Sequence, residues 1–279
     1  MLTRIALVVS YILYCIRFLV GPWKYFQLNA TYFNEQRNLF SKLDMDARIP
    51  KQWQLEQFMD IANNNPSAYP VFMKPEWGQN SQGIVRIDNL LALQKIRQKR
   101  SPSPPFYLLQ QAAPEKREFE IFVIPEKDNL QQFSVLSITE TCNSGDDPLP
   151  INGIYNDHTY YTDCLGLLSL TQQQKIWSHL KQIGEFRIVR YGVRADSLES
   201  LIAGQFHVIE INLYVPMPLI LLVQDVGFWQ KIKFIRRSMK QLAKVTTMIP
   251  RTQAVKSVFF NKLKLAQRLK RATKNETSL

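Results

Sequence analysis

The stretch FHVIEIN, residues 206–212, says more about the fold than any other part of the chain. Its alternating side chains predict a strand with one buried and one open face. Glu210 and Asn212 are two residues apart, so they lie on the same face of that strand. A carboxylate next to an amide oxygen provides the hard ligands that Mg²⁺ prefers, although the exposed face of a half-buried sheet is the commoner setting for such a pair.

The preceding stretch FRIVRYGVR, residues 186–194, predicts a second strand that carries Arg190 and Arg194. A guanidinium group binds phosphate or carboxylate in a bidentate manner, so arginines beside Glu210 would hold an anionic ligand. A solvated basic patch is the alternative interpretation.

Farther upstream, YPVFMKPEWGQNSQGI at residues 69–84 predicts a strand that ends at Lys74, a glycine-containing turn and a returning strand at 84–87. The turn contains Gly78, Ser81 and Gly83, and such a loop can bring backbone N–H groups close to phosphate oxygens. A lysine fixed at the end of a strand supplies a compact positive charge. An ordinary hairpin with a surface lysine fits the pattern equally well.

The rest of the chain mixes strands with helices and shows no internal repeat. Its patterns predict strands at 106–110, 119–124 and 133–138, helices at 89–100 and 171–184, and a turn-rich stretch at 143–163. Thr171 is the expected N-cap of the second helix. Together these elements predict an α+β fold with antiparallel sheets.

Composition excludes several classes of protein. With 46% hydrophobic residues in 279, the chain is not intrinsically disordered, and with 10 glycines and no triplet period it is not collagen-like. Cys15, Cys142 and Cys164 are too few and too widely spaced for a disulfide framework or a CxxC zinc site. This cysteine usage indicates a reducing compartment.

The three motifs, taken in order, resemble the ATP-grasp superfamily, most of all its D-alanine–D-alanine ligase and carboxylate–amine ligase branch. Residues 69–84 resemble the strand, lysine and glycine loop, and LLQQAAPEKREFEIFVI at 108–124 resembles the adenine hinge with its following strand. RYGVR…GQFHVIEIN resembles the segment that binds metal and transition state. The resemblance covers roughly residues 40–225 and implies a two-subdomain ATP-grasp fold that uses ATP and Mg²⁺.

The resemblance also implies a role for each matching residue. Lys74 matches the lysine on the nucleotide phosphates, Lys42 an earlier phosphate-contacting lysine, and Arg190 the arginine that stabilises acyl-phosphate and tetrahedral species. The other implied positions are the phosphate-covering loop Gly78, Ser81 and Gly83, the adenine hinge Gln110, Gln111 and Ala113, the nucleotide or ribose residue Glu118, and the magnesium ligands Glu210 and Asn212. Glutamine is a departure in the hinge, where an acid is usual.

Gly192 is the main departure from the family pattern, which has a metal-binding aspartate there. The nearby acids Glu185 and Asp196 lie at other spacings. The motifs imply a ligase that activates an unidentified carboxylate as an acyl phosphate for attack by an amine or similar nucleophile. Gly192 favours the alternative of an inactive or weakly active nucleotide-binding scaffold. A basic membrane or RNA adaptor that no longer binds ATP is a third hypothesis, and His158 is a further candidate near the substrate.

The N-terminal segment, residues 1–27, contains an uncharged apolar run from Ile5 to Ile16 that continues past Arg17 to Trp23. An uncleaved membrane anchor, a helix in the membrane interface and a helix packed on the protein all fit this pattern, and membrane association is favoured over packing alone. The segment shows no small-residue cleavage site of a signal peptide.

The C-terminal segment, residues 226–279, has a net charge of +13 against +12 for the whole chain, and Glu276 is its single acid. Its pattern predicts two basic amphipathic helices, at 228–242 and 255–269, separated by Pro250. These features favour an anionic membrane surface on the cytoplasmic side. Docking on the body, residues 28–225, is the alternative, and no specific nucleic acid is expected because no recognition module is present.

Overall fold

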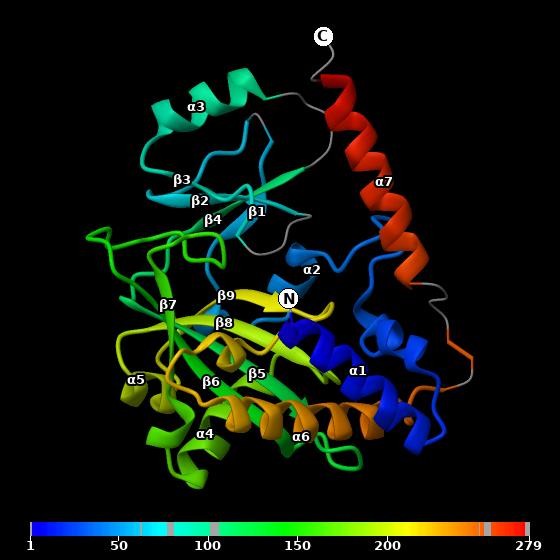
Figure 1. Cartoon of the computed structure of the whole chain (residues 1–279). Helices are drawn as coiled ribbons and strands as arrows, with labels where there is room; N and C mark the ends of the chain where they lie inside the picture. Colours follow the sequence, from blue (N-terminus) through cyan, green and yellow to red (C-terminus); the bar gives the residue numbers. More distant parts are fainter. Residues whose placement is uncertain are drawn as a thin grey trace.

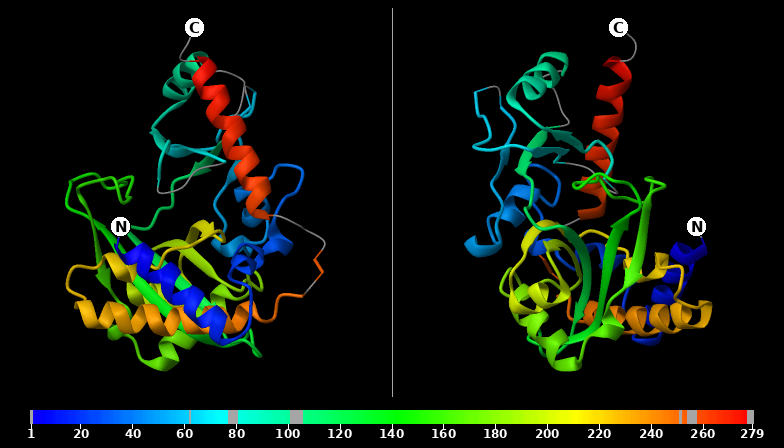
Figure 2. Two further views of the ribbon diagram at one scale, coloured as in Figure 1. Left: turned by 45° about the vertical axis from the view of Figure 1, so that its right-hand side comes forward. Right: turned by 90° about the vertical axis from the view of Figure 1, so that its left-hand side faces the viewer.

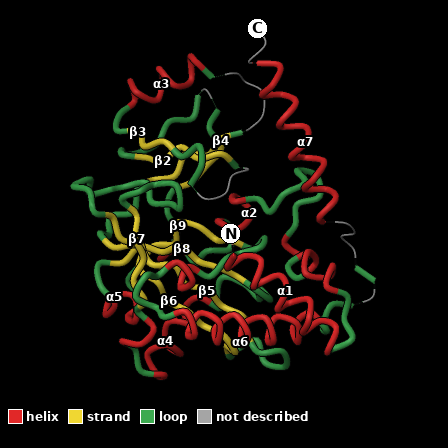
Figure 3. Tube along the Cα trace, in the orientation of Figure 1, coloured by secondary structure: helices red, strands yellow, loops and turns green. Residues whose placement is uncertain are grey.

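The computed structural model describes residues 2–61, 63–76, 81–100, 106–250, 252–253 and 258–276. Its strands form two antiparallel sheets in separate layers (Figures 1 and 3). The smaller sheet has the order β1-β4-β2-β3, and the larger has the order β7-β6-β5-β8-β9. The α+β class with antiparallel sheets is therefore confirmed.

The smaller sheet lies above the larger one in Figure 1, with α3 on its outer side. Leu93 of α3 is fully buried against Val71 and Leu109 of the sheet. The predicted hairpin is confirmed, since β2 and β3 pair antiparallel. The elements of this layer are β1 (Gln57–Met59), β2 (Val71–Pro75), β3 (Val85–Ile87), α3 (Leu90–Lys99) and β4 (Tyr107–Gln111).

The larger sheet comprises β5 (Arg117–Pro125), β6 (Phe133–Asn143), β7 (Thr159–Asp163), β8 (Val189–Ala195) and β9 (His207–Asn212). Alternation along β5 divides its side chains between two cores. Phe119 and Ile121 pack in the core that includes residues of α4 (Leu170–Leu180) and α5 (Leu198–Ala203). Phe122 and Ile124 belong to a second core, with residues of α1 (Leu2–Arg17) and α6 (Phe228–Thr246).

Helix α1 packs beside α6 (Figure 2). Tyr11 and Cys15 are buried in this contact, and the hydroxyl groups of Tyr11 and Thr246 lie 2.9 Å apart. The first basic amphipathic helix of the tail therefore buries its apolar face on the body. The division of the chain into three parts, with boundaries at residues 27 and 225, stays a prediction.

The remaining helical elements are η1 (Pro22–Gln27), η2 (Ala30–Tyr32), α2 (Lys42–Asp46), η3 (Lys51–Trp53), η4 (Leu165–Leu167), η5 (Leu219–Leu222) and α7 (Val258–Glu276).

Within the described residues, no single helix is long and apolar enough to cross a membrane. The bent pair of Leu2–Arg17 and Pro22–Tyr32, with 106° between its parts, reaches the required length and composition only in combination.

Local expectations differ from the structure at several places. Helix α4 begins at Leu170, and Ser169 is its N-cap instead of Thr171, because the Ser169 hydroxyl accepts a hydrogen bond from the Gln172 N–H in a capping box. Strand β7 lies within the stretch 143–163 that was predicted to be turn-rich, and α5 has no counterpart among the predicted elements. The second tail helix begins at Val258, and the start expected at Val255 lies outside the described residues.

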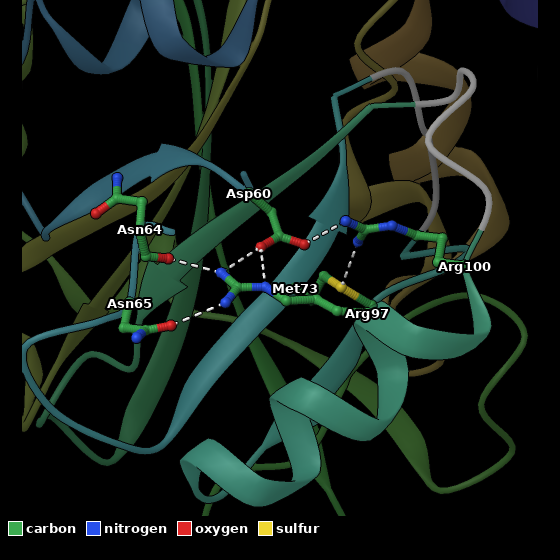
Figure 4. Close-up of polar contacts among 6 residues, drawn as sticks. All are labelled: Asp60, Asn64, Asn65, Met73, Arg97 and Arg100. Carbon is green, nitrogen blue, oxygen red and sulfur yellow. Dashed lines mark hydrogen bonds and ion pairs between the residues drawn. The ribbon is translucent and has the colours of Figure 1, made fainter. Parts of the chain in front are cut away.

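A buried ion-pair cluster holds α3 to the smaller sheet (Figure 4). The Asp60 side chain, just after β1, is completely buried and accepts a 2.8 Å hydrogen bond from Nε of Arg97. Arg100 pairs with the other carboxylate oxygen and donates to Sδ of Met73 in β2. A second guanidinium nitrogen of Arg97 bonds Asn65. One carboxylate thus fixes both arginines at the end of α3.

Asp60→Asn removes this shared charge, and we expect it to lower the free energy of unfolding by about 3 kcal/mol, since breaking a buried pair leaves charged groups uncompensated. Asp88→Asn is the matched control, because the Asp88 side chain is 61% exposed in its pair with Arg86 and its loss should cost less than about 1 kcal/mol. Urea unfolding monitored by circular dichroism measures both values. Equal losses in the two variants would contradict the structural role given to Asp60.

Candidate functional site

A cavity of about 690 Å³ lies between the two sheets and extends to α1 and α6. Side chains from β2 and β4 of the smaller sheet and from β5, β8 and β9 of the larger sheet line it. Most of the residues singled out from the sequence are among them: Lys74, Ser81, Gln110, Gln111, Ala113, Glu118, Arg190, Glu210 and Asn212. Residues almost 140 positions apart in the chain are thus brought to one site.

Lys74 connects the two sheets. Its ammonium group donates 2.7 Å to Oε1 of Gln110 in β4 and 3.0 Å to the carbonyl of Ile209 in β9. Burial, followed by the nearby positive charge of Lys42, lowers the pKa of Lys74 to about 7. The site therefore holds a lysine that can be neutral or charged near neutral pH, and an anionic ligand would favour the charged form.

Lys42, Glu210 and Asn212 form a connected polar group close to Lys74. The Lys42 ammonium, at the start of α2, lies 3.7 Å from Oε1 of Glu210 and donates to the carbonyl of Pro75. Nδ2 of Asn212 donates 2.9 Å to Oε2 of Glu210. Burial by itself raises the pKa of Glu210, but the positive charges of Lys42, Arg190 and Lys74 bring it below its usual value. Glu210 is thus held as a carboxylate.

Glu120 was not singled out from the sequence, yet it lies at the centre of the site. Strand pairing places Gly192 of β8 directly between Glu120 of β5 and Glu210 of β9. A Cβ atom at residue 192 would lie 3.3 Å from Oε1 of Glu120. Oε2 of Glu120 is 2.9 Å from Nε of Arg190, and burial raises the pKa of Glu120 to about 8. A carboxylate from the neighbouring strand therefore occupies the space over Gly192.

Glu118 lies two residues from Glu120 on the same face of β5, and burial raises the pKa of its carboxyl group. Nδ2 of Asn152 donates 3.0 Å to Oε2 of Glu118, and the Ser81 hydroxyl donates to the Asn152 carbonyl. Ser81 thus links the loop after β2 to the larger sheet. Gly83 adopts a positive φ of 75° and does not line the cavity, and Gly78 lies outside the described residues.

Other candidates lie away from the cavity. His158 is exposed, and its Nδ1 is 3.2 Å from the Ser144 hydroxyl. Asp196 accepts a hydrogen bond from the backbone N–H of Lys116. Neither these residues nor Glu185 line the cavity.

The donor set of the site fits a magnesium ion that is also held by phosphate. In the part of the chain that the structure describes, no group of three His, Cys, Asp or Glu side chains is placed to hold a metal. Mg²⁺, however, is commonly bound by one or two carboxylates plus substrate phosphates, and Glu210 and Asn212 offer a carboxylate and an amide group on one face of β9. Two buried hydroxyl oxygens on the same sheet face, Oγ1 of Thr139 and Oγ1 of Thr141, lack a hydrogen-bond partner.

No protein-family model and no curated protein sequence matches the chain. Among solved structures, it is similar to the L-amino acid ligase of Bacillus licheniformis, with 17% identity, a TM-score of 0.46, and coverage of 72% of this chain and 47% of the ligase. It is also similar to the D-alanine–D-alanine ligase of Bacillus anthracis complexed with ATP, with 12% identity, a TM-score of 0.47, and coverage of 74% and 67%.

A third similar structure is the VanG D-Ala:D-Ser ligase of Enterococcus faecalis, with 12% identity, a TM-score of 0.48, and coverage of 74% and 61%. The chain spans about half the length of the first of these ligases. All three are named as ligases of amino acids. Because identity is low and every TM-score is below 0.5, the function proposed below rests on the chain's own residues.

Proposed function

We propose that the chain is an ATP-dependent ligase that activates a carboxylate as an acyl phosphate and joins it to an amine or similar nucleophile. The observation that supports this most is the placement of Lys74 and Gln110 from one sheet opposite Arg190, Glu210 and Asn212 from the other, around one cavity. Such a site has basic groups for phosphates, oxygen ligands for a metal and a cleft between two layers for a nucleotide.

Each residue has a role in the proposed reaction. Lys74 and Lys42 would contact the phosphates, and residues 110–113 with Glu118 would hold the adenosine. An oxygen of the substrate carboxylate attacks the γ-phosphorus, the bond to the β-phosphate oxygen breaks, and ADP leaves. The amine then attacks the acyl carbon, inorganic phosphate leaves, and the amine loses a proton. Arg190 would stabilise the negative charge that grows in both steps.

Glu210 and Asn212 would hold Mg²⁺, and Glu120 would add a third oxygen ligand over Gly192. The metal would supply positive charge to the phosphates. The support for Glu120 is its position, because its carboxylate lies beside the glycine where the family pattern has an aspartate. The donor that is missing at residue 192 would thus be provided from the next strand.

Hydroxylamine trapping tests the proposed chemistry. An acyl phosphate formed from ATP and a carboxylate reacts with hydroxylamine to give a hydroxamate and inorganic phosphate, which are measured without knowledge of the natural nucleophile. We expect hydroxamate from a panel of carboxylic acids with the wild-type protein and none with Arg190→Gln. Carboxylate-independent hydrolysis of ATP would contradict the proposal.

A nucleotide-binding scaffold is the second candidate, favoured by the lack of a three-carboxylate group in the described part of the chain. It predicts ATP binding that does not depend on Mg²⁺ and gives no hydroxamate with any acid. The same trapping experiment therefore separates the two candidates.

The lowered pKa of Lys74 predicts a pH dependence of nucleotide affinity. Above pH 7 the free lysine is mostly neutral and must take up a proton to contact phosphate, so affinity should fall by up to about 10-fold per pH unit from pH 7.5 to 9.5. Lys74→Arg keeps its charge and should flatten the profile. The pKa of Glu120 is about 8, so it titrates in the same range, and the series is repeated with Glu120→Gln. Identical profiles for wild type and Lys74→Arg would contradict this role of Lys74.

We also propose that the protein works on a membrane surface, on the ATP-containing cytoplasmic side. The support is a continuous apolar face of α1 that points away from α6. Leu13 and Ile16 are 62% and 63% exposed there, and Leu2, Ile5 and Val9 extend the face along the helix. An exposed apolar helix face of this kind suits the boundary between headgroups and acyl chains. The neighbouring helix α6 exposes three positively charged side chains, Lys233, Arg236 and Lys240.

Leu13→Asp places a charge in the middle of this face, and we expect it to weaken binding to anionic phospholipid vesicles by about 10-fold. Leu170→Asp is a matched control, since Leu170 is also 62% exposed but lies on α4. Vesicle sedimentation measures the partitioning of each variant. Equal binding of both variants and wild type would show that α1 does not mediate membrane contact.

A further inference from the structure

The sheet face that carries the lining residues Glu118, Glu120, Arg190 and Ile188 changes from charged to apolar along two neighbouring segments. On one face of β5 the order is Glu118, Glu120, Phe122, Ile124, and on the paired face of β8 it is Arg194, Gly192, Arg190, with Ile188 just before the strand. Phe122, Ile124 and Ile188 all belong to the core shared with α1 and α6. Arg190 therefore stands at the border between a charged region and an apolar region of one continuous cavity.

The apolar region has walls from four separate parts of the chain. Leu7 and Tyr11 come from α1, Phe26 from η1, and Met239 and Leu242 from α6. The loop after β9 closes the remaining side, and the Arg190 guanidinium donates 3.1 Å to the Met217 carbonyl in that loop. Along the strands, Glu118, Glu120 and Glu210 lie on the other side of Arg190, and Asn212 pairs directly with it, so the apolar region is left for another reactant.

The apolar region opens beside the exposed face of α1. Val8 and Ile12 line the cavity, yet they remain 56% and 37% exposed. The same side chains thus belong to the cavity wall and to the apolar outer surface of the helix. An aliphatic chain can follow this surface into the cavity, and the charged residue of α1 that lines the cavity is Arg4, near the start of the helix.

We propose that the carboxylate substrate is an amphiphile, a carboxylic acid with a long aliphatic chain, whose carboxylate lies at Arg190 and whose chain fills the apolar region. This inference rests on the proposed function and names the substrate class of that site. The acid oxygen attacks the γ-phosphorus of ATP with loss of ADP, which gives an aliphatic acyl phosphate. Each methylene transferred from water to the apolar region favours binding about fourfold, so chain length controls affinity.

Equilibrium dialysis with radiolabelled fatty acids below their micelle concentrations tests the assignment. We expect affinity to rise by two- to fourfold per methylene from hexanoate to laurate, and laurate to give more hydroxamate than hexanoate. Val8→Asp should weaken laurate binding at least 10-fold. Val9→Asp is the matched control, because Val9 is 49% exposed on the same helix but does not line the cavity, and it should bind laurate like wild type.

The outcomes separate this inference from the proposed function. Affinity that does not depend on chain length, equal laurate binding by the two aspartate variants, or equal binding of dodecylamine would overturn the substrate class. ATP binding that requires Lys74, with no laurate binding, would leave the nucleotide site standing and overturn only the amphiphile. Laurate binding without ATP binding would support the apolar region as a lipid site and contradict the ligase.

Discussion

Lys74→Met should abolish most ATP binding without unfolding the protein. The ammonium group is the buried charge that reaches both sheets, and its contacts with phosphate would be charge-assisted hydrogen bonds, so we expect the dissociation constant for ATP to rise about 100-fold. Because burial disfavours the charged lysine, methionine should leave the free energy of unfolding unchanged or higher. Equilibrium dialysis with labelled ATP measures the first quantity, and urea unfolding measures the second.

Lys175→Met is the control for removal of a lysine charge, since Lys175 is exposed on α4 and distant from the cavity lining. It should bind ATP like wild type. ATP binding by Lys74→Met within a factor of two of wild type would contradict the nucleotide site between the sheets.

Substitutions at Glu120 and Gly192 should have coupled effects on Mg²⁺-dependent ATP binding. Glu120→Gln keeps the shape of the side chain but removes its charge, and we expect the Mg²⁺-dependent gain in ATP affinity to fall about 10-fold. Gly192→Asp by itself should also impair binding, because its Cβ would lie 3.3 Å from both Oε1 of Glu120 and Cγ1 of Ile209, and two carboxylates would compete for one space.

The double variant Glu120→Ser with Gly192→Asp moves the carboxylate from one strand to the next. It should recover most of the Mg²⁺ dependence that Glu120→Ser and Gly192→Asp each lose alone, and titration of Mg²⁺ at fixed ATP concentration measures the recovery. Strictly additive losses in the double variant would show that Glu120 does not replace the carboxylate missing at residue 192.

The sequence predicted the strands that carry Lys74, Arg190 and Glu210 because each has its own local signal of alternation and turn residues. It did not single out Glu120, although its spacing of two from Glu118 places both on one face. The importance of Glu120 comes from strand register, which pairs it with Gly192 about seventy residues later, and no local pattern contains that information. Asn152 was missed for a similar reason, since it reaches Glu118 from a turn-rich stretch.

The two ends of the chain also show what a local sequence pattern does not determine. Apolar spacing predicted a helix in each, but the same spacing suits a membrane surface and a neighbouring helix equally. In the structure, the apolar side chains of α1 have two different environments. Tyr11 and Cys15 pack towards α6, while Leu13 and Ile16 remain exposed. The apolar side of α6 packs against the body, residues 28–225. The net charge of the C-terminal segment does not predict this packing.

Calorimetric titration of the full chain with ATP, with and without Mg²⁺, tests the central claim most directly. The account predicts one saturable site for each protein molecule, at least 10-fold tighter with Mg²⁺ than without it. Absence of binding heat in both conditions, at protein concentrations that detect a dissociation constant of about 1 mM, would contradict a nucleotide site between the two sheets.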